Sequence, residues 1–471
     1  MVEKRRSICL FCSLGCGYVL RTSNDQVIAI DYDKVNPINT GSLCPRGHYN
    51  LDLINHPQRL TEPQIGNRKV SWDEAVSYAK KVLKKFDPSS IGIALSSISS
   101  NEDALMACRA AELMGTENIF AAGDPADIEA YQGNRWAVEG SSMQNLEGIG
   151  GSDALLIIGD ILTRSPVLSK RINKVKYGKR GNQIIVIDPN ISHTSWFATT
   201  HLKNKPGTEA LLMAAVLKVI AEENKRGEID IDIRKVSQTV GIPADSIIRA
   251  AKAFDASESG TMIFVPGGNV QRNDLVQYFI KMASSFSINK KHITFYGFGN
   301  SLGVNTIIDS MTKNKQSKIG GIKALISLGD EANVEGLDLA VRCGFFIPDT
   351  IDDNTVLLPM ASHMERKGSV TLAGGRTESF KPIAHKVGGR SGLEILMSLT
   401  DTKMEFDDVL DETDKILGKG IKQEKVDLKQ KISEAQKITA KGSASPANIT
   451  HFGNNKLVKR FFWYRVNNKN G

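Results

Sequence analysis

The chain of 471 residues is 41% hydrophobic and 24% charged, a composition typical of a soluble globular protein long enough for two or three domains. Its 60 basic residues outnumber 52 acidic ones but are interspersed along the chain, which excludes nucleic acid as a favoured partner and leaves a pyrophosphate or an acidic electron carrier. Because no signal peptide and no run of 18 apolar residues occur, we expect a cytoplasmic protein without a transmembrane segment.

Most of the cysteines stand near the N-terminus, at Cys9, Cys12, Cys16 and Cys44. The first three are too close together for mutual disulfides without strain, so metal ligation is the simplest interpretation. Three thiolates with a distant fourth suit a [4Fe-4S] cluster. A structural zinc site is the alternative, although its thiolates usually come as two short pairs. Residues 18–22 and 26–31 predict a β-hairpin that brings Cys44 back beside the other three.

This opening resembles the N-terminal cluster domain of the molybdenum or tungsten bis-pterin oxidoreductases, especially the formate dehydrogenase catalytic subunit. The similar stretches include Asn36-Pro37, the run from Cys44 to Gly47 and the run from His56 to Pro63. The likeness continues along most of the chain. It implies an α/β fold, with a small [4Fe-4S] domain followed by two pseudo-symmetric doubly wound α/β domains. It also implies a second cofactor, a molybdenum or tungsten bis-molybdopterin guanine dinucleotide.

Helices and strands alternate after the cluster motif. Ser71 opens a capping box and a helix, residues 91–97 predict a buried strand, and Ser100 caps the next helix. Cys108 lies on the apolar face of that helix and is expected in the core. The domains that we expect are 1–60 for the cluster, 61–135 with 305–400 for a discontinuous α/β domain, 136–304 for an inserted dinucleotide-binding-like α/β domain, and 401–471 for a charged helix or linker and an aromatic tail.

Two strands end beside a carboxylate. Residues 153–160 end in Gly159-Asp160 and residues 182–189 in Asp188-Pro189, with a helix over residues 167–176 between them. A similar design returns with strands near residues 323–330, 344–349 and 355–359, which indicates a coarse internal duplication. Parallel sheets bind nucleotides at such ends, because glycine lets phosphate approach the backbone and a carboxylate accepts from ribose or guanine. An ordinary structural turn is the alternative at each position.

The resemblance also implies which residues contact the cofactor. In the family, two pterin guanine dinucleotides lie in opposite directions across the pair of domains. The similar residues in one half are Gly159, Asp160, Asp188, Pro189, Gly207, Thr208 and Glu209. Those assigned to the other half are Gly268, Asn269, Gly329, Glu331 and Asn333. The family usually has aspartate where Glu209 stands.

The passage that carries the metal ligand in the family differs in this chain. The family ligand is commonly selenocysteine, cysteine, serine or aspartate, whereas this chain offers either Asp127 or Ala126, depending on which flanking motif fixes the alignment. Asp127 is therefore a possible oxygen ligand of molybdenum or tungsten. The alternative is that Asp124 and Asp127 cap a helix that begins near Ile128.

Two more positions bear on the reaction. Arg46 stands where the family often has a lysine between cluster and pterin, and arginine keeps the charge and the donors. Tyr296 stands where formate dehydrogenases have an arginine that orients formate, and a neutral phenol cannot form a bidentate pair with a carboxylate. Because that arginine and the cysteine or selenocysteine ligand are both missing, we do not expect this chain itself to oxidise formate.

The match to formate dehydrogenases ends near Met397, so we expect their C-terminal pterin-capping β-barrel domain to be absent. This truncation resembles the formylmethanofuran dehydrogenase subunit whose pterin-capping domain resides in a separate chain. It implies partners: other redox subunits, ferredoxin-like or flavin-containing, and a chain with the capping domain. The aromatic residues at 461–464 follow a flexible linker and would dock either on a partner or on this chain.

Three functions are compatible with these features. The first is the iron–sulfur subunit of a molybdopterin-family oxidoreductase complex that passes electrons through a [4Fe-4S] cluster. The alternative is a catalytically degenerate electron-transfer or scaffold subunit without pterin, like the large cluster-bearing subunit of respiratory complex I. A zinc-stabilised adaptor without a redox role is a third.

Overall fold

A small antiparallel sheet holds the first cysteines. We describe a computed structural model for residues 2–24, 26–312, 321–329, 332, 334 and 336–442. The sheet consists, in spatial order, of β1 (Val2–Ile8), β2 (Gly17–Ser23) and β3 (Gln26–Tyr32). The hairpin of β2 and β3 confirms the prediction. Strand β1 has an exposed, charged sequence without a strand pattern, yet it pairs with β2 up to Ile8 and Gly17 and so brings Cys9 beside Cys16.

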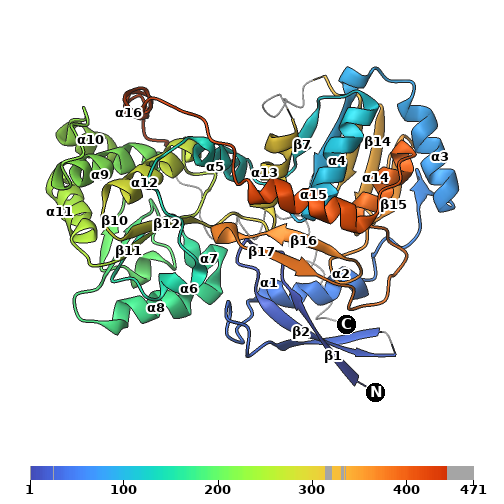
Figure 1. The fold of residues 1–471 in the computed structure, drawn as a ribbon, viewed down its shortest axis with the longest axis horizontal. Coiled ribbons are helices and arrows are strands. Elements are labelled where there is room, and N and C mark those ends of the chain that lie inside the picture. Colours follow the sequence, from blue (N-terminus) through green and yellow to red (C-terminus); the bar gives the residue numbers. More distant parts are fainter. Residues whose placement is uncertain are drawn as a thin grey trace.

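Three short helices follow Cys44: α1 (Pro45–His48), the 3₁₀ helix η1 (Tyr49–Leu51) and α2 (Asp52–Asn55). Proline suits the start of α1, because its fixed φ is helical and it has no N–H group to leave unpaired. Leu53 and Ile54 of α2 are buried. Figure 1 shows α1 and α2 between the small sheet and the two larger units of the molecule.

One larger unit is built on a seven-stranded sheet with the order β5-β4-β15-β14-β13-β6-β7. Strands β15 to β7 are parallel, and β4 pairs antiparallel with β15. The strands are β4 (Gln64–Ile65), β5 (Arg68–Lys69), β6 (Ile91–Leu95), β7 (Ile119–Ala121), β13 (Ala324–Leu328), β14 (Leu339–Gly344) and β15 (Thr355–Pro359). The helices are α3 (Trp72–Leu83), η2 (Pro88–Ser90), α4 (Asn101–Met114), α13 (Ser301–Met311) and α14 (Gly392–Thr400).

Several local predictions for this unit are confirmed. Ser71 caps α3, Ser100 forms a reciprocal capping box with Asp103 at the start of α4, and Cys108 is buried. The strand predicted at 344–349 was wrong, since β14 ends at Gly344. The chain there leaves the sheet, because the backbone groups of residues 345 and 347 bond instead to those of residues 60 and 58.

The other larger unit is a parallel five-stranded sheet with the order β10-β9-β8-β11-β12. Its strands are β8 (Ala154–Ile158), β9 (Gln183–Ile187), β10 (Thr200–Leu202), β11 (Gly260–Phe264) and β12 (Lys290–Thr294). From β8 the chain adds β9 and β10 toward one edge of the sheet, and it then adds β11 and β12 toward the other edge. The chain therefore switches direction between β8 and β11, and ligands of doubly wound sheets bind outside the carboxyl ends at such a point.

Helices cover both faces of the five-stranded sheet. Leu155 and Ile157 of β8 belong to the core beneath α6 (Leu146–Ile149) and α8 (Ser169–Gly178), whereas Leu156 and Ile158 belong to the core on the opposite face. Burial of both faces explains the continuous apolar run of this strand. The helices of the opposite core are α5 (Pro125–Arg135), α9 (Glu209–Glu223), α10 (Ile233–Val240), α11 (Ala244–Asp255) and α12 (Asn273–Phe286).

Later segments connect the units. The hairpin of β16 (Gly368–Thr371) and β17 (Thr377–Phe380) lies above the small sheet in Figure 1, and α15 (Phe406–Gly418) and α16 (Leu428–Gln436) pass from α4 to α9. In the part of the chain that the structure describes, no helix is both long and apolar enough to cross a membrane. The aromatic residues at 461–464 lie outside the described residues. The domain boundaries given above stay a prediction.

Candidate functional site

The four N-terminal cysteines gather in one place. Cys9, Cys12 and Cys16 are buried, and Cys44 is partly buried at the N-cap of α1. Burial and the neighbouring thiols raise the pKa of Cys9 to about 12 and raise that of Cys16 well above its usual value. Adjacent buried thiolates repel one another, so a bound cation would stabilise the thiolate forms of Cys9 and Cys16.

Tertiary contacts fix the loop between the first and third cysteines. Gly299 N–H donates to the Leu10 carbonyl at 3.0 Å, and Ala373 N–H donates to the Ser13 carbonyl at 2.9 Å. The Ser13 hydroxyl donates to the Tyr296 carbonyl at 2.9 Å. A Cβ atom at position 299 would lie 2.6 Å from the Leu10 carbonyl oxygen, so this approach requires glycine. Both larger units and the β16–β17 hairpin thus support the cysteine loop.

The site offers four sulfur ligands, and both iron–sulfur clusters and structural zinc ions are bound by four thiolates. Among residues 2–442, apart from the few not described, no three His, Cys, Asp or Glu side chains lie close enough to hold one metal ion. The thiolates around a cubane bind four different irons and therefore stand farther apart than thiolates around a single zinc. The four gathered sulfurs, with the first three on a loop held by backbone contacts, fit a [4Fe-4S] cluster.

Arg46 connects the cysteine loop to the five-stranded unit. It is the buried second residue of α1, and its charge favours the thiolate form of Cys16. Its guanidinium donates to the Arg164 carbonyl at the end of α7 (Ile161–Arg164). The next residue, Ser165, donates from its hydroxyl to Cys12 Sγ at 3.6 Å. The single turn of α7 is therefore docked on the cysteine loop at two neighbouring residues.

Asp127 lies among protein donors. Its carboxylate oxygens accept from Gly297 N–H at 2.8 and 3.0 Å, and one accepts from the Ser301 hydroxyl at 2.9 Å. The Arg164 guanidinium stands 4.0 Å away. Burial raises the pKa of Asp127 to about 7, although the arginine acts to lower it. These contacts tie α5 to the start of α13 and favour the structural interpretation of Asp127; a metal-ligand role stays a prediction.

The helix that carries Asp127 begins earlier than predicted. Helix α5 starts at Pro125 rather than near Ile128, and Asp124 is its N-cap, accepting from Ala126 N–H at 3.0 Å. Proline at the first helical position explains the shift, because its φ is already helical. Ala126 is buried.

Tyr296 points into the core of the five-stranded unit. Its hydroxyl accepts from the Asn134 side-chain amide at 3.1 Å, and Asn134 in turn accepts from Gln277 at 3.2 Å. Burial raises the pKa of Tyr296, so the phenol stays neutral at any physiological pH. Its polar atom is occupied by a structural network that joins α5 to α12.

The predicted nucleotide residues after β8 lie at the switch point. Gly159 has a φ of +91°, and a Cβ atom there would lie 2.9 Å from the Val265 carbonyl oxygen that follows β11. Asp160 caps α7: its Oδ1 accepts from Thr163 N–H and from both the N–H and the hydroxyl of Thr194. Its Oδ2 is buried without a hydrogen-bond partner.

Two more buried carboxylates stand beside Asp160. Asp188 follows β9 and accepts from Asn190 N–H at 2.9 Å, and Glu209 at the start of α9 accepts from the Asn204 amide at 3.1 Å. Burial raises the pKa of Asp188, and the charge of Asp160 adds to this effect. Burial likewise raises the pKa of Glu209 to about 7, with a contribution from Asp188. One oxygen of each, Asp188 Oδ2 and Glu209 Oε2, is buried without a partner.

The remaining predicted residues of this edge lie on the adjoining loops. Pro189 follows Asp188, Thr208 immediately precedes α9 and donates from its hydroxyl to the Lys205 carbonyl, and Gly207 has a φ of +80°. Lys441 lies across the same loops: its N–H donates to the Pro206 carbonyl at 2.8 Å and its ammonium to the Gly268 carbonyl at 3.3 Å. Gly268 and Asn269 therefore follow β11 in the five-stranded unit, which corrects their assignment to the other half. The error arose because sequence order does not reveal which strands share a sheet.

These unpaired oxygens test whether the edge fits a guanine dinucleotide. A buried acceptor without a donor costs about 1–3 kcal/mol. Three of them, on Asp160, Asp188 and Glu209, stand where three neighbouring strand ends meet. Guanine offers donors at its N1 and N2 atoms and ribose offers two hydroxyls, so such a ligand supplies what these carboxylates lack. The residues present fit the group.

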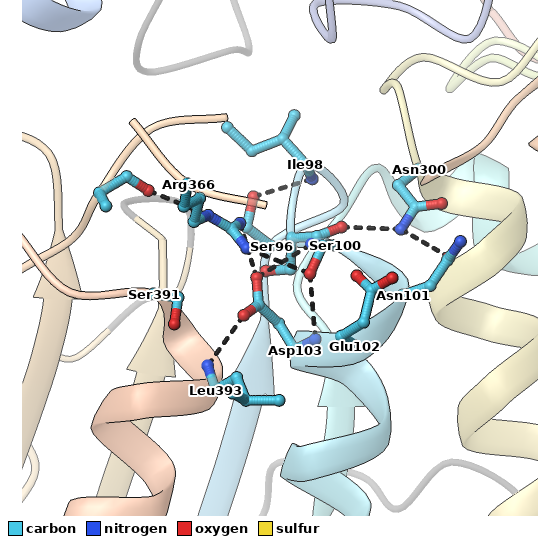
Figure 2. Close-up of polar contacts among 12 residues, drawn as sticks. Ser96, Ile98, Ser100, Asn101, Glu102, Asp103, Asn300, Arg366, Ser391 and Leu393 are labelled. Atoms are coloured by element: carbon cyan, nitrogen blue, oxygen red, sulfur yellow. Dashed lines mark hydrogen bonds and ion pairs between the residues drawn. The ribbon is translucent and has the colours of Figure 1, made fainter. Parts of the chain in front are cut away.

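The seven-stranded sheet presents a different edge. Figure 2 shows Asp103 at the start of α4 paired with Arg366, whose guanidinium reaches Asp103 at 2.7 Å and Ser100 at 3.1 Å. Asp103 also accepts from Leu393 N–H at 2.9 Å, and Glu102 accepts from Ser369. A cavity of about 330 Å³ adjoins this network. Unlike the acids after β8, these carboxylates are satisfied by protein donors.

Gly329, predicted for this second edge, has a φ of +106° and donates to the Cys343 carbonyl at 2.7 Å. Glu331 and Asn333 lie outside the described residues. Sequence reasoning missed Ser165, Asn204 and Lys441. None of them belongs to a spacing pattern, and only the folded chain brings them to the cysteines or the strand ends.

The fold and the site define an iron–sulfur protein whose cluster domain is joined to two α/β units. Residues 2–56 match the family model of the molybdopterin oxidoreductase Fe4S4 domain, and residues 59–401 match that of molybdopterin oxidoreductase. The chain belongs to the molybdopterin oxidoreductase family, for which a [4Fe-4S] cluster and a molybdopterin are the cofactors. The predicted family and fold class are confirmed.

The relatives include formate dehydrogenases. The chain is 26% identical over 285 residues to F420-dependent formate dehydrogenase 2 subunit alpha of Methanococcus maripaludis and 29% identical over 285 residues to the corresponding subunit alpha of Methanocaldococcus jannaschii. Each match covers 55% of this chain and 42% of the relative. The solved structure of acetylene hydratase from Pelobacter acetylenicus aligns with a TM-score of 0.61 at 16% identity, over 85% of this chain and 70% of that one. This likeness concerns the fold alone.

Proposed function

We propose that this chain is the iron–sulfur subunit of a molybdopterin-family oxidoreductase complex. Cys9, Cys12, Cys16 and Cys44 hold a [4Fe-4S] cluster that exchanges single electrons with the other redox centres of the complex. Two adjoining features support the proposal. Four thiols are gathered in the cysteine loop, and the strand ends at the switch point carry buried carboxylate oxygens without partners. The short helix α7 connects them, because the residue after it contacts Cys12.

In this proposal the residues after β8, β9 and β10 bind one guanine dinucleotide. The carboxylates of Asp160, Asp188 and Glu209 accept from the base and the ribose, and the positive-φ glycines Gly159 and Gly207 allow close approach of the diphosphate. When bound, a molybdopterin supplies two-electron chemistry at its metal, which the cluster divides into single electrons. Gly268, Asn269, Pro189 and Thr208 shape the loops around the ligand, and Lys441 adds a positive charge at their rim.

Arg46 serves as the cation between the two cofactors. It is buried, its charge favours the thiolate of Cys16, and its guanidinium binds the turn that Asp160 caps. A buried positive charge stabilises the reduced form of either neighbour, so Arg46 raises both reduction potentials. In this proposal the chain works with other redox subunits in the cytoplasm. We do not expect it to oxidise formate itself, because it lacks the arginine and the cysteine or selenocysteine ligand of formate dehydrogenases.

The second candidate is an electron-transfer or scaffold subunit that binds no pterin. One observation favours it: Asp127, the candidate metal ligand, has its carboxylate engaged by Gly297, Ser301 and Arg164. The two candidates share the cluster and differ at the switch point. The unpaired oxygens there favour the first.

Metal and nucleotide analysis of the anaerobically purified chain, with its partners, tests both candidates. Iron at four per chain with molybdenum or tungsten, and guanine nucleotide released by acid, is the result expected for the first. Iron without either metal or nucleotide would establish the second. Zinc without iron would refute both. A Cys108→Ser variant is the matched control, since that buried cysteine lies in α4 away from the site and should leave the iron content unchanged.

A further inference from the structure

We propose that Ser165 raises the reduction potential of the cluster through its hydrogen bond to Cys12. The inference rests on the proposed ligation of a [4Fe-4S] cluster by the four cysteines. It goes beyond that proposal by assigning a role to Ser165, a residue that no sequence motif marks. Ser165 is a positioning residue in the second layer around the cluster. It comes from the five-stranded unit, 153 positions along the chain from the cysteine that it contacts.

The hydroxyl of Ser165 is held in place by its own backbone. Its N–H donates to the Ile161 carbonyl at 2.7 Å and closes α7, and its carbonyl accepts from Leu168 N–H at 3.0 Å and opens the 3₁₀ helix η3 (Pro166–Leu168). The residue is 1% exposed. With both backbone groups bonded and the side chain buried, the hydroxyl oxygen stays 3.6 Å from Cys12 Sγ, a normal distance for a bond to sulfur.

A second contact keeps the turn against the cluster loop. Arg46, two residues after Cys44, donates to the carbonyl of Arg164, the peptide group that directly precedes Ser165. The turn is thus attached on two sides, once to the first cysteine loop and once to the helix after the fourth cysteine. A change in the position of α7 would move the hydroxyl and the guanidinium together.

The direction of the effect follows from electrostatics. The hydroxyl turns the positive end of its dipole toward the Cys12 sulfur. The step concerned is one-electron reduction of the cluster, in which no bond forms or breaks and the electron comes from an external donor. Reduction adds negative charge that is shared with the sulfurs, so a donated hydrogen bond stabilises the reduced form more than the oxidised form. Removing the hydroxyl must therefore lower the potential.

A matched pair of variants tests the inference. Ser165→Ala deletes the hydroxyl that reaches sulfur. Ser284→Ala deletes a similarly buried hydroxyl in α12, which donates to the Lys281 carbonyl of its own helix. The midpoint potential of each anaerobically purified protein is measured by redox titration followed by electron paramagnetic resonance. We expect Ser165→Ala to shift the potential downward and Ser284→Ala to leave it at the wild-type value, both with unchanged iron.

Two further readouts separate tuning from structural damage. In deuterium oxide, electron–nuclear resonance should detect an exchangeable deuteron near the cluster that is present in the wild type and in Ser284→Ala and absent in Ser165→Ala. Ser165→Thr keeps a hydroxyl and should keep the wild-type potential. An unshifted potential in an iron-loaded Ser165→Ala protein would refute this inference alone, and so would loss of iron in that variant only. Absence of iron from the wild type would refute the proposed function as well.

Discussion

Glu209 is the residue whose replacement tests the nucleotide edge most directly. Its carboxylate is buried, one oxygen accepts from Asn204, and the other has no donor. Glu209→Gln keeps the size of the side chain and removes the charge. In the cofactor-free chain we expect the variant to be more stable than the wild type at pH 8, because the buried charge is disfavoured there, and nearly equal in stability at pH 5.

The magnitude comes from the pKa. Burial raises the pKa of Glu209 from 4.5 to about 7. Because the folded value is the higher one, the contribution of this carboxyl to stability is complete below pH 4.5 and is lost as the pH rises through about 7. The difference of about 2.5 in pKa corresponds to about 3 kcal/mol at about 1.4 kcal/mol for each pKa unit. Glutamine escapes that loss, so the variant gains up to about 3 kcal/mol at pH 8.

The assay is urea unfolding of the cofactor-free full chain at both pH values. The difference in the free energy of unfolding between variant and wild type at each pH removes the contribution of the other titrating groups. Glu222→Gln on the exposed side of the same helix is the control, since its surface ion pair with Lys218 contributes only about 0–1 kcal/mol. An equal gain at both pH values, or none at pH 8, would show that Glu209 is not a strained buried acid. The same substitution should weaken retention of guanine nucleotide, because the amide group of glutamine replaces one acceptor oxygen of the carboxylate with a donor.

Three other variants test neighbouring parts of the site. Cys16→Ser should abolish the visible absorption and most of the iron of the purified protein; full iron would exclude Cys16 as a ligand. Asp103→Asn breaks the buried pair with Arg366 and should lower the free energy of unfolding by about 3–5 kcal/mol, measured by denaturant titration, so a loss under 1 kcal/mol would contradict the pairing. Asp127→Asn should leave the metal content unchanged, because the carboxylate is engaged by Gly297 and Ser301; loss of molybdenum or tungsten alone would restore its role as ligand.

The cluster motif and the alternation of elements were readable from the sequence because both depend on short-range spacing. The cysteine spacing indicated the metal site, the capping residues Ser71 and Ser100 marked helix starts, and the apolar run of β8 marked a strand. Strand β1 escaped prediction, since its side chains are exposed and its pairing depends on β2. The strand predicted at 344–349 was misplaced for another reason: the backbone groups of residues 345 and 347 bond to residues 60 and 58, outside the sheet.

What the sequence by itself determined is the family, the α/β class, the four candidate sulfur ligands and the acids at the strand ends. Only the tertiary structure decided that Lys441 joins the loops of Pro206 and Gly268, that Asp127 is engaged by Gly297, and that Ser165 reaches Cys12. The physical reason is that a motif records neighbours along the chain, whereas burial, unpaired oxygens and bonds to sulfur depend on which distant strands share an edge. The packing of the two larger sheets around the cysteine loop determines which of these distant residues come into contact.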